Sequence, residues 1–96
     1  MTGADLFQAD LTGADLFQAD LTEANLTETI LTWSNMTEAN VGGANLTGAS
    51  LTEANLTEAD LTGANLTKVN LKDAILTGAK LTDVIGADLT GALTDS

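Results

Sequence analysis

The carboxylate side chains are the groups in this sequence best able to do chemistry. Asp and Glu account for 14 of the 96 residues, against three lysines, and the first four acids recur every five residues, at Asp5, Asp10, Asp15 and Asp20. Regularly spaced carboxylates can bind cations, transfer protons or form an anionic surface. His, Cys, Arg and Tyr are absent, so the usual general base, thiolate nucleophile and bidentate phosphate ligand are missing. We therefore predict a non-enzymatic protein with no cofactor and no metal site, whose acids form a surface.

The formal net charge of −11 restricts the partners. Such a charge disfavours direct binding to nucleic acid or to anionic membranes, and it favours solubility or a basic partner. The segment from Met1 to Asp5 has no basic stretch followed by an apolar one, and no apolar run is long enough to span a membrane. We therefore expect a cytoplasmic protein with an unknown protein partner, either a basic protein or a DNA-binding protein.

The acids are embedded in a repeat of five residues. Of the sixteen central positions from Leu6 to Leu81, fourteen are leucine. The residue two places earlier is alanine in thirteen cases, the residue between them is Asp or Asn in twelve, and threonine follows the leucine in twelve. A period of five fits neither an α-helix nor a coiled coil, because leucines five apart would spiral around a helix instead of forming one stripe.

An extended backbone fits each pentad. Alternation places Ala and Leu inside and Asp/Asn and Thr outside, and it leaves the fifth residue to turn a corner before the next alanine points inward. A turn that needs positive φ favours glycine. Glycine occupies this corner position at Gly13, Gly43, Gly48, Gly63 and Gly78. Each pentad is thus predicted to form one side of a coil.

These units resemble those of the pentapeptide-repeat family. Ala-Asp-Leu-Phe-Gln, Ala-Asn-Leu-Thr-Glu and Ala-Asp-Leu-Thr-Gly are similar to the family's defining units, and the resemblance covers 4–83 without interruption. It implies four pentads per coil and a right-handed winding. The expected fold is therefore all-β, a right-handed quadrilateral parallel β-helix of about four to five coils. The chain is then one domain over 1–96, with regular repeats over 4–83 and an irregular C-terminal coil over 84–96.

On that four-sided frame, acids twenty residues apart stack on one another. Like charges at this spacing repel, so they are kept either for solubility or for function. With coils about 4.8 Å apart, the net charge amounts to about one negative charge per 2 Å of axis, against about one per 1.7 Å for duplex DNA. The candidate acidic interaction surface comprises the first-coil ring Asp5, Asp10, Asp15 and Asp20 and the stacked pairs Glu38 with Glu58 and Glu53 with Asp73.

The resemblance also supplies an alternative function. Some pentapeptide-repeat proteins mimic duplex DNA and occupy DNA gyrase, so the acidic surface could be a DNA mimic that binds gyrase, another topoisomerase or another DNA-binding protein. Gyrase-directed members look longer and carry aromatic central residues, whereas the centres here are leucines. The leading hypothesis is therefore a non-enzymatic acidic scaffold or protein-interaction module, and the DNA mimic is the alternative.

Two apolar side chains depart from the repeat on its outer face. Ile30 and Trp33 occupy outward positions on either side of Leu31 and form a candidate apolar contact for a partner. Scattered exposed hydrophobic residues are common, which is the competing explanation. Phe7 and Phe17 take the threonine position on opposite sides of the first coil, so they cannot form one patch.

Threonine arrays offer a further alternative. Outward threonines recur twenty apart, and flat arrays of this kind could bind ice, although the same pattern is the ordinary surface of the family. One array comprises Thr27, Thr47 and Thr67, and another comprises Thr37, Thr57 and Thr77.

The interior and the ends contain the irregularities. Thr29 and Ser34 replace alanine and place hydroxyls inside, where each needs a backbone partner. After Asp83, the segment 84–86 is interpreted as three extra residues before the repeat resumes at 87–91, which predicts a bulge at a corner of the last coil. Neither end shows a cap and Met1 falls on a central position, so we expect end-to-end self-association or the loss of native flanking sequence.

Overall fold

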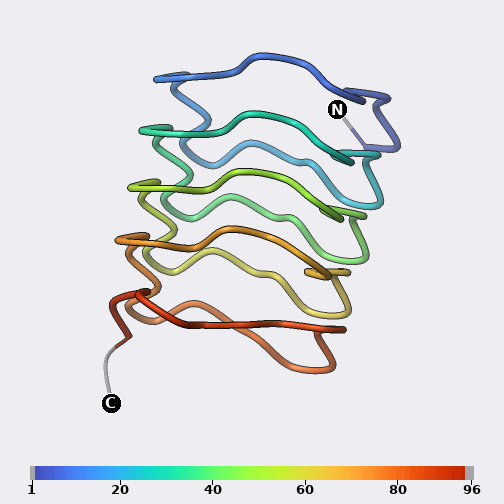
Figure 1. The fold of residues 1–96 in the computed structure, drawn as a ribbon. Coiled ribbons are helices and arrows are strands. Elements are labelled where there is room, and N and C mark those ends of the chain that lie inside the picture. The colour runs from blue at the N-terminus through green and yellow to red at the C-terminus, as the bar shows by residue number, and fades with distance from the viewer. Residues whose placement is uncertain (1, 95–96) are drawn as a thin grey trace.

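The chain winds into a stack of similar coils in the computed structural model, which describes residues 2–94 (Figure 1). Neighbouring coils pair through single parallel β-bridges, and the described residues contain neither a helix nor a continuous strand. The pairing is short because each pentad turns a corner after only a few extended residues. Figure 1 shows the coils following one another along one axis, from the blue N-terminal coil to the red C-terminal one.

Each corner is a β-turn formed by the end of one pentad and the start of the next. In the first coil, the amide of Ala9 donates to the carbonyl oxygen of Leu6 at 2.9 Å. The third turn residue, Gln8, has a φ of 59°, while Phe7 before it has no positive φ, and this combination is the φ pattern of a type II turn. Every fifth residue from Gly3 to Asp83 shares the positive φ. The predicted corner position is confirmed.

The bridges join residues twenty apart and so define four sides. The amide of Asn25 donates to the carbonyl oxygen of Ala4 at 2.8 Å, and the carbonyl oxygen of Asn25 accepts the amide of Leu6 at 2.8 Å. This exchange repeats around the coil. We number the sides by their first bridge residue: side 1 bears Asp5, side 2 bears Asp10, side 3 bears Asp15 and side 4 bears Asp20, each with the residues stacked on it.

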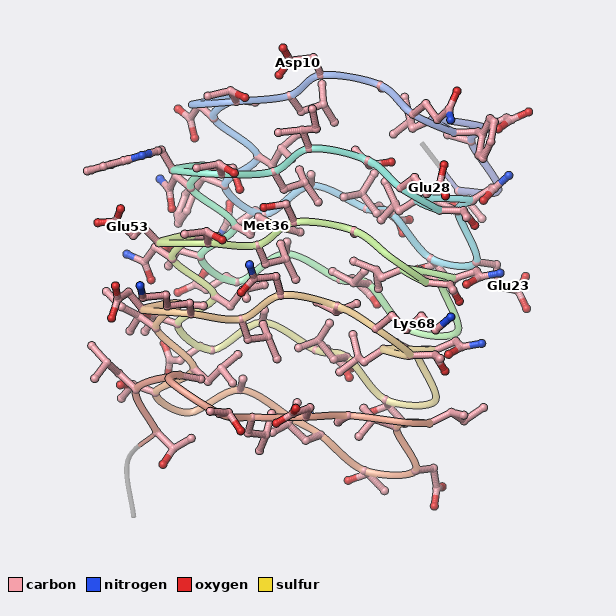
Figure 2. The ribbon with its side chains drawn as sticks, viewed as in Figure 1. Asp10, Glu23, Glu28, Met36, Glu53 and Lys68 are labelled. Atoms are coloured by element: carbon pink, nitrogen blue, oxygen red, sulfur yellow. The ribbon has the colours of Figure 1, made fainter. Side chains whose placement is uncertain are left out.

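Columns of leucine and alanine fill the interior. From Leu21 to Leu76, every central residue and every inward residue of the alanine position is buried. Figure 2 shows Met36, one of the two central residues that are not leucine, inside the stack. Small alanines alternate with large leucines along each side, so the four walls can approach one another closely without leaving voids. The inward alternation predicted for the pentad is confirmed.

The two buried hydroxyls have different environments. Thr29 Oγ1 donates to the carbonyl oxygen of Leu6 at 2.8 Å, so this hydroxyl has the backbone partner that its position requires. Ser34 Oγ is equally buried but has no hydrogen-bond partner among the described residues. The expectation that each hydroxyl must find a partner is therefore confirmed for Thr29 and is wrong for Ser34.

The outward Asp or Asn caps the following turn. Asp10 Oδ1 accepts hydrogen bonds from the amide of Thr12 at 3.1 Å and from the hydroxyl of Thr12 at 2.6 Å. The same pair of bonds recurs between Asn55 and Thr57. Such Asx turns satisfy backbone amides that the bridges leave over. The Thr12 hydroxyl, together with the Thr12 amide, holds the pKa of Asp10 below its ordinary value of 3.8. The Asp/Asn position thus stabilises the fold itself.

The C-terminal coil differs from the prediction. Asn65 bridges Ile85 twenty residues on, but Ile75 bridges Leu93 only eighteen residues on. The chain has therefore lost two residues between Ile85 and Leu93, so it contains no inserted bulge. Gly86 alone replaces a central, a threonine and a corner position. An insertion of three residues and a deletion of two differ by one full repeat of five. The repeat therefore resumes at the same positions in both cases, and the sequence pattern could not distinguish them.

Gly86 makes this two-residue shortening of the last coil, which we call the shortcut, possible. Its φ is +67°, and a Cβ at this position would lie 2.6 Å from Thr67 Oγ1 and 3.2 Å from Thr67 Cα. Any other residue would meet the preceding coil. Beyond the shortcut, the repeat resumes with a capped turn, because the amide of Thr90 donates to Asp88 Oδ1 at 3.0 Å and the amide of Ala92 donates to the carbonyl oxygen of Leu89 at 3.0 Å.

The terminal coils are more open than the middle of the stack. Leu6, Leu11 and Leu16 pack against the core but are only partly buried. At the other end, Leu89 and Leu93 are exposed. The central position predicted for Met1 lies outside the described residues, as do Asp95 and Ser96.

Candidate interaction surface

The four first-coil aspartates lie on four different sides. Each is exposed, and each accepts an amide through Oδ1 from the residue two places on. Asp20 also accepts the Thr2 hydroxyl at 2.9 Å through Oδ2. The ring predicted from the sequence is therefore present, but its members point in different directions and do not converge on one ligand. Each carboxylate caps a turn and also adds negative charge to the N-terminal end.

The stacked acids occupy two different corners of the coil. The amide of Glu38 donates to the carbonyl oxygen of Thr57 at 2.9 Å, which places Glu38 next to Glu58 in the same corner column. The amide of Glu53 donates in the same way to Lys72 at 3.0 Å and so lies next to Asp73. All four side chains are exposed. The structure therefore brings together the members of each pair and keeps the two pairs on separate corners.

Corner side chains can reach one another from coil to coil. Gln8 Nε2 donates to Glu28 Oε1 at 2.8 Å, and Gln18 Nε2 donates to Glu38 Oε1 at 2.8 Å. Figure 2 shows Glu23 and Glu53 projecting away from the stack at its corners. Positive φ is unfavourable for residues other than glycine. Acids at these positions thus project charge outward from a backbone site where the fold alone would favour glycine.

The charges are divided sharply along the axis. Residues 2–67 contain ten acids and no lysine, whereas 68–96 contain all three lysines and four acids. The first part thus carries −10 of the formal net charge of −11 and the remainder carries −1. The order of the charged residues already contained this signal, which the total charge alone did not reveal. Coils built from 2–67 form a purely anionic surface, which we call the acidic coils.

Ile30 and Trp33 are exposed on side 2, as the sequence predicted. Ile30 is 41% exposed and lies between Asp10 and Ser50 in the bridge column, while Trp33 is 63% exposed at the following corner with a φ of 66°. Phe7 and Phe17 are each about half exposed, on sides 1 and 3. The two phenylalanines are therefore separated, whereas Ile30 and Trp33 share one side of one coil.

Comparison with known proteins identifies the repeat. Four overlapping segments, at 4–43, 14–52, 44–83 and 54–93, match the family model described as pentapeptide repeats, in eight copies. The chain belongs to the pentapeptide-repeat family. The pentapeptide-repeat neighbours establish the winding as a right-handed β-helix.

Two solved pentapeptide-repeat proteins are similar over nearly the whole chain. Rfr23 from the cyanobacterium Cyanothece 51142 is 43% identical, with a TM-score of 0.84 over 96% of this chain and 60% of its own length. A pentapeptide-repeat protein from the Arabidopsis thaliana thylakoid lumen is 37% identical, with a TM-score of 0.88 over 95% of this chain and 65% of its own. The chain thus spans less than two thirds of either structure. A search of curated proteins finds no significant match.

The pentapeptide-repeat surface has no concave site within 2–94. No pocket is found there, and no group of three acids in this part of the chain is arranged to hold a metal ion. None of the described residues forms a helix able to cross a membrane.

The outward threonines form hydrogen bonds within the turns. Thr27 Oγ1 donates to Asn25 Oδ1 at 2.7 Å, and Thr47 Oγ1 donates to Asn45 Oδ1 at 2.7 Å. These hydroxyls stabilise turns, which weakens the ice-binding alternative.

Proposed function

We propose that this pentapeptide-repeat chain is a non-enzymatic interaction module whose acidic coils bind a basic protein partner. The division of charge carries the proposal, since ten carboxylates stand in 2–67 without a single lysine. A surface of one sign raises the local concentration of oppositely charged partners and steers their approach. A stack of about four to five rigid coils suits this role because its side chains are held at fixed spacings.

The non-enzymatic assignment rests on the chemistry of the side chains. Serine and threonine hydroxyls have no histidine to activate them, because the sequence contains none. The hydroxyl and amide of Thr62 hold the pKa of Asp60 below its ordinary value, so this carboxylate stays ionised at neutral pH and is a poor general acid. A cytoplasmic location and end-to-end association of copies stay predictions, and light scattering at two protein concentrations tests the second.

A DNA mimic is the alternative, and the axial charge density favours it. Residues 4–67 span about three coils at about 4.8 Å each, or about 15 Å, so their ten negative charges amount to about one per 1.5 Å. Duplex DNA carries about one per 1.7 Å. The acidic coils therefore reach the charge density of a duplex over a short length, and a DNA-binding protein such as gyrase becomes a specific form of basic partner.

Two titrations test these functions. Poly-lysine of about twenty residues is expected to bind the chain by calorimetry, with an affinity that falls as salt rises from about 50 to about 200 mM, because counterions screen the contact. Absence of binding at low salt would contradict the interaction module. A gyrase supercoiling assay then separates the two forms of the proposal: salt-sensitive inhibition supports the mimic, and no effect at large molar excess removes gyrase as the target.

A further inference from the structure

Trp33 occupies a position where the fold gains little from it. Its φ of 66° lies in the left-handed region, which is unfavourable for a bulky side chain, and the residue is 63% exposed. The other described corner residues are glycine or polar and charged residues. An indole at this corner therefore contributes strain to the backbone and buries only part of its surface.

Ile30, on the same side of the coil, also weakens the local structure. Its position normally holds Asp or Asn, whose side-chain oxygen accepts the amide two residues on. Isoleucine has no acceptor and cannot cap the turn, and it is 41% exposed. Two successive departures thus place apolar surface outward at the expense of stability. We call Ile30 and Trp33 the side 2 ledge.

The charged residues that neighbour the side 2 ledge directly are acidic. The amide of Trp33 donates to the carbonyl oxygen of Thr52 at 3.1 Å, so the next residue in the Trp33 corner column is Glu53. Ile30 pairs with Asp10 in the coil before it. All charged residues from 9 to 58 are acids, and the lysine on side 2, Lys72, lies in the coil after Glu53, where its carbonyl oxygen accepts the amide of Glu53 at 3.0 Å. A second copy of this chain, with a net charge of −11, would be repelled from this surface.

This combination selects a cationic side chain with a flat face. An arginine can stack its guanidinium on an indole and at the same time donate N–H groups to a carboxylate, whereas the lysine ammonium is a hydrated point charge. We propose that Trp33 and Glu53 bind an arginine of an extended basic segment, with Ile30 contacting a neighbouring apolar residue. The inference rests on the proposed function and adds to it the partner's chemistry and the docking position.

The single tryptophan makes the ledge directly observable. Trp33 is the only tryptophan in the sequence, so its fluorescence reports on this site alone. Acetylated hexa-arginine, hexa-lysine and hexa-glutamate are titrated against the full chain at low salt. Hexa-arginine is expected to change the fluorescence and to bind at least about threefold more tightly than hexa-lysine, because only the guanidinium stacks. Hexa-glutamate is expected to have no effect.

Variants separate the ledge from general charge. Trp33→Gly places the favoured residue at the strained corner, so it is expected to stay folded while its affinity for hexa-arginine, measured by calorimetry, falls about fivefold. Glu53→Gln is expected to weaken binding about as much. Glu23→Gln is the matched control, because it removes the same charge at the diagonally opposite corner. This substitution is expected to weaken binding less than twofold.

The outcomes distinguish this inference from the proposed function. If a folded Trp33→Gly variant keeps its affinity, or if Glu53→Gln and Glu23→Gln weaken binding equally, the ledge proposal is overturned while the acidic module stands. If neither hexa-arginine nor poly-lysine binds the wild-type chain at low salt, both are overturned. Equal affinities of wild type for hexa-arginine and hexa-lysine would also contradict a stacked guanidinium.

Discussion

Thr29 Oγ1 donates to the carbonyl oxygen of Leu6 at 2.8 Å, across the junction between the first and second coils. Five residues later, Ser34 occupies the equivalent inward position of the next side with its hydroxyl buried and without a partner among the described residues. A buried hydroxyl that forms no hydrogen bond loses its hydration without compensation. The two positions therefore have opposite consequences for stability, although the sequence makes them look alike.

Replacing the two residues by the alanine that the repeat favours should change stability in opposite directions. Ser34→Ala is expected to raise the free energy of unfolding by about 1 kcal/mol, and Thr29→Ala to lower it by about 1 kcal/mol. Urea denaturation followed by circular dichroism measures both, and each variant serves as the control for the other. Destabilisation by Ser34→Ala would show that this hydroxyl has a partner after all.

Restoring the turn cap at Ile30 should stabilise the second coil. Ile30→Asn is expected to add the Asx acceptor for the Thr32 amide and to raise the free energy of unfolding by about 0.5–1.5 kcal/mol, because the exposed isoleucine loses little buried surface. Asn35→Ala removes the corresponding cap at Thr37 and is expected to have the opposite effect. If both substitutions are neutral in urea denaturation, the Asx turns do not contribute to stability.

The capped aspartates predict how stability depends on pH. Thr side chains and amides lower the pKa of Asp10, Asp20, Asp60 and Asp88 below 3.8. A pKa that is lower in the folded state contributes stability above the unfolded pKa, and this contribution is lost as the pH falls through the folded pKa. Thermal stability is therefore expected to be constant from neutral pH to about pH 5 and to fall below about pH 4.

A single threonine tests the cause of this dependence. Thr62→Val removes the hydroxyl that donates to Asp60 Oδ1 at 2.6 Å, so the pKa of Asp60, followed by NMR of its carboxyl carbon, is expected to rise. Thr52→Val is the control, because the residue two places before Thr52, where Asp60 stands relative to Thr62, is Ser50, which has no carboxyl group. An unchanged Asp60 pKa in the Thr62→Val variant would assign the shift to another group.

Gly86 should be far less tolerant of a side chain than Gly13. Both have positive φ, but a Cβ at Gly86 would lie 2.6 Å from Thr67 Oγ1, whereas a Cβ at Gly13 has nothing within 4 Å. Gly13→Ala is expected to cost about 1 kcal/mol and Gly86→Ala at least about 2 kcal/mol. Amide exchange of Leu76, which donates to the carbonyl oxygen of Leu93, reports the loss of the last pairing locally. Similar costs for both substitutions would contradict the shortcut.

The sequence predicted the coil because one period determines several features at once. Leucine and alanine alternate inward and a corner follows every fifth residue, so burial and turns have to agree along the whole chain. Alternation did not reveal that Asp10 and Thr12 bond to each other, although Asp or Asn followed two residues later by Thr was visible in eight of the sixteen regular pentads. The hydrogen bond is indicated by which two residue types occur together in a pentad, and not by the fact that both are polar.

Other features of the fold could be determined only from the structure. The repeat pattern alone could not separate three extra residues after Asp83 from two missing ones, and the bridge from Ile75 to Leu93, eighteen residues apart, decides between them. The stacking of Glu53 on Asp73 and on Trp33 followed from the repeat, but the φ of 66° at Trp33 and the 63% exposure of its side chain are known only from the structure. The division of charge at Lys68 could have been read from the sequence directly.

Charge reversal in two places tests most directly whether the acidic coils are the binding surface. Glu38→Lys with Glu58→Lys alters the acidic coils, while Asp73→Lys with Asp83→Lys makes the same change in net charge at corner positions beyond Lys68. Asp73 belongs to the candidate surface predicted from the sequence, but it lies outside the acidic coils of 2–67. Poly-lysine binding is measured for both double variants at low salt. The first is expected to lose at least about tenfold in affinity and the second less than about threefold. Equal losses would show that only net charge matters and would contradict a defined acidic interaction surface.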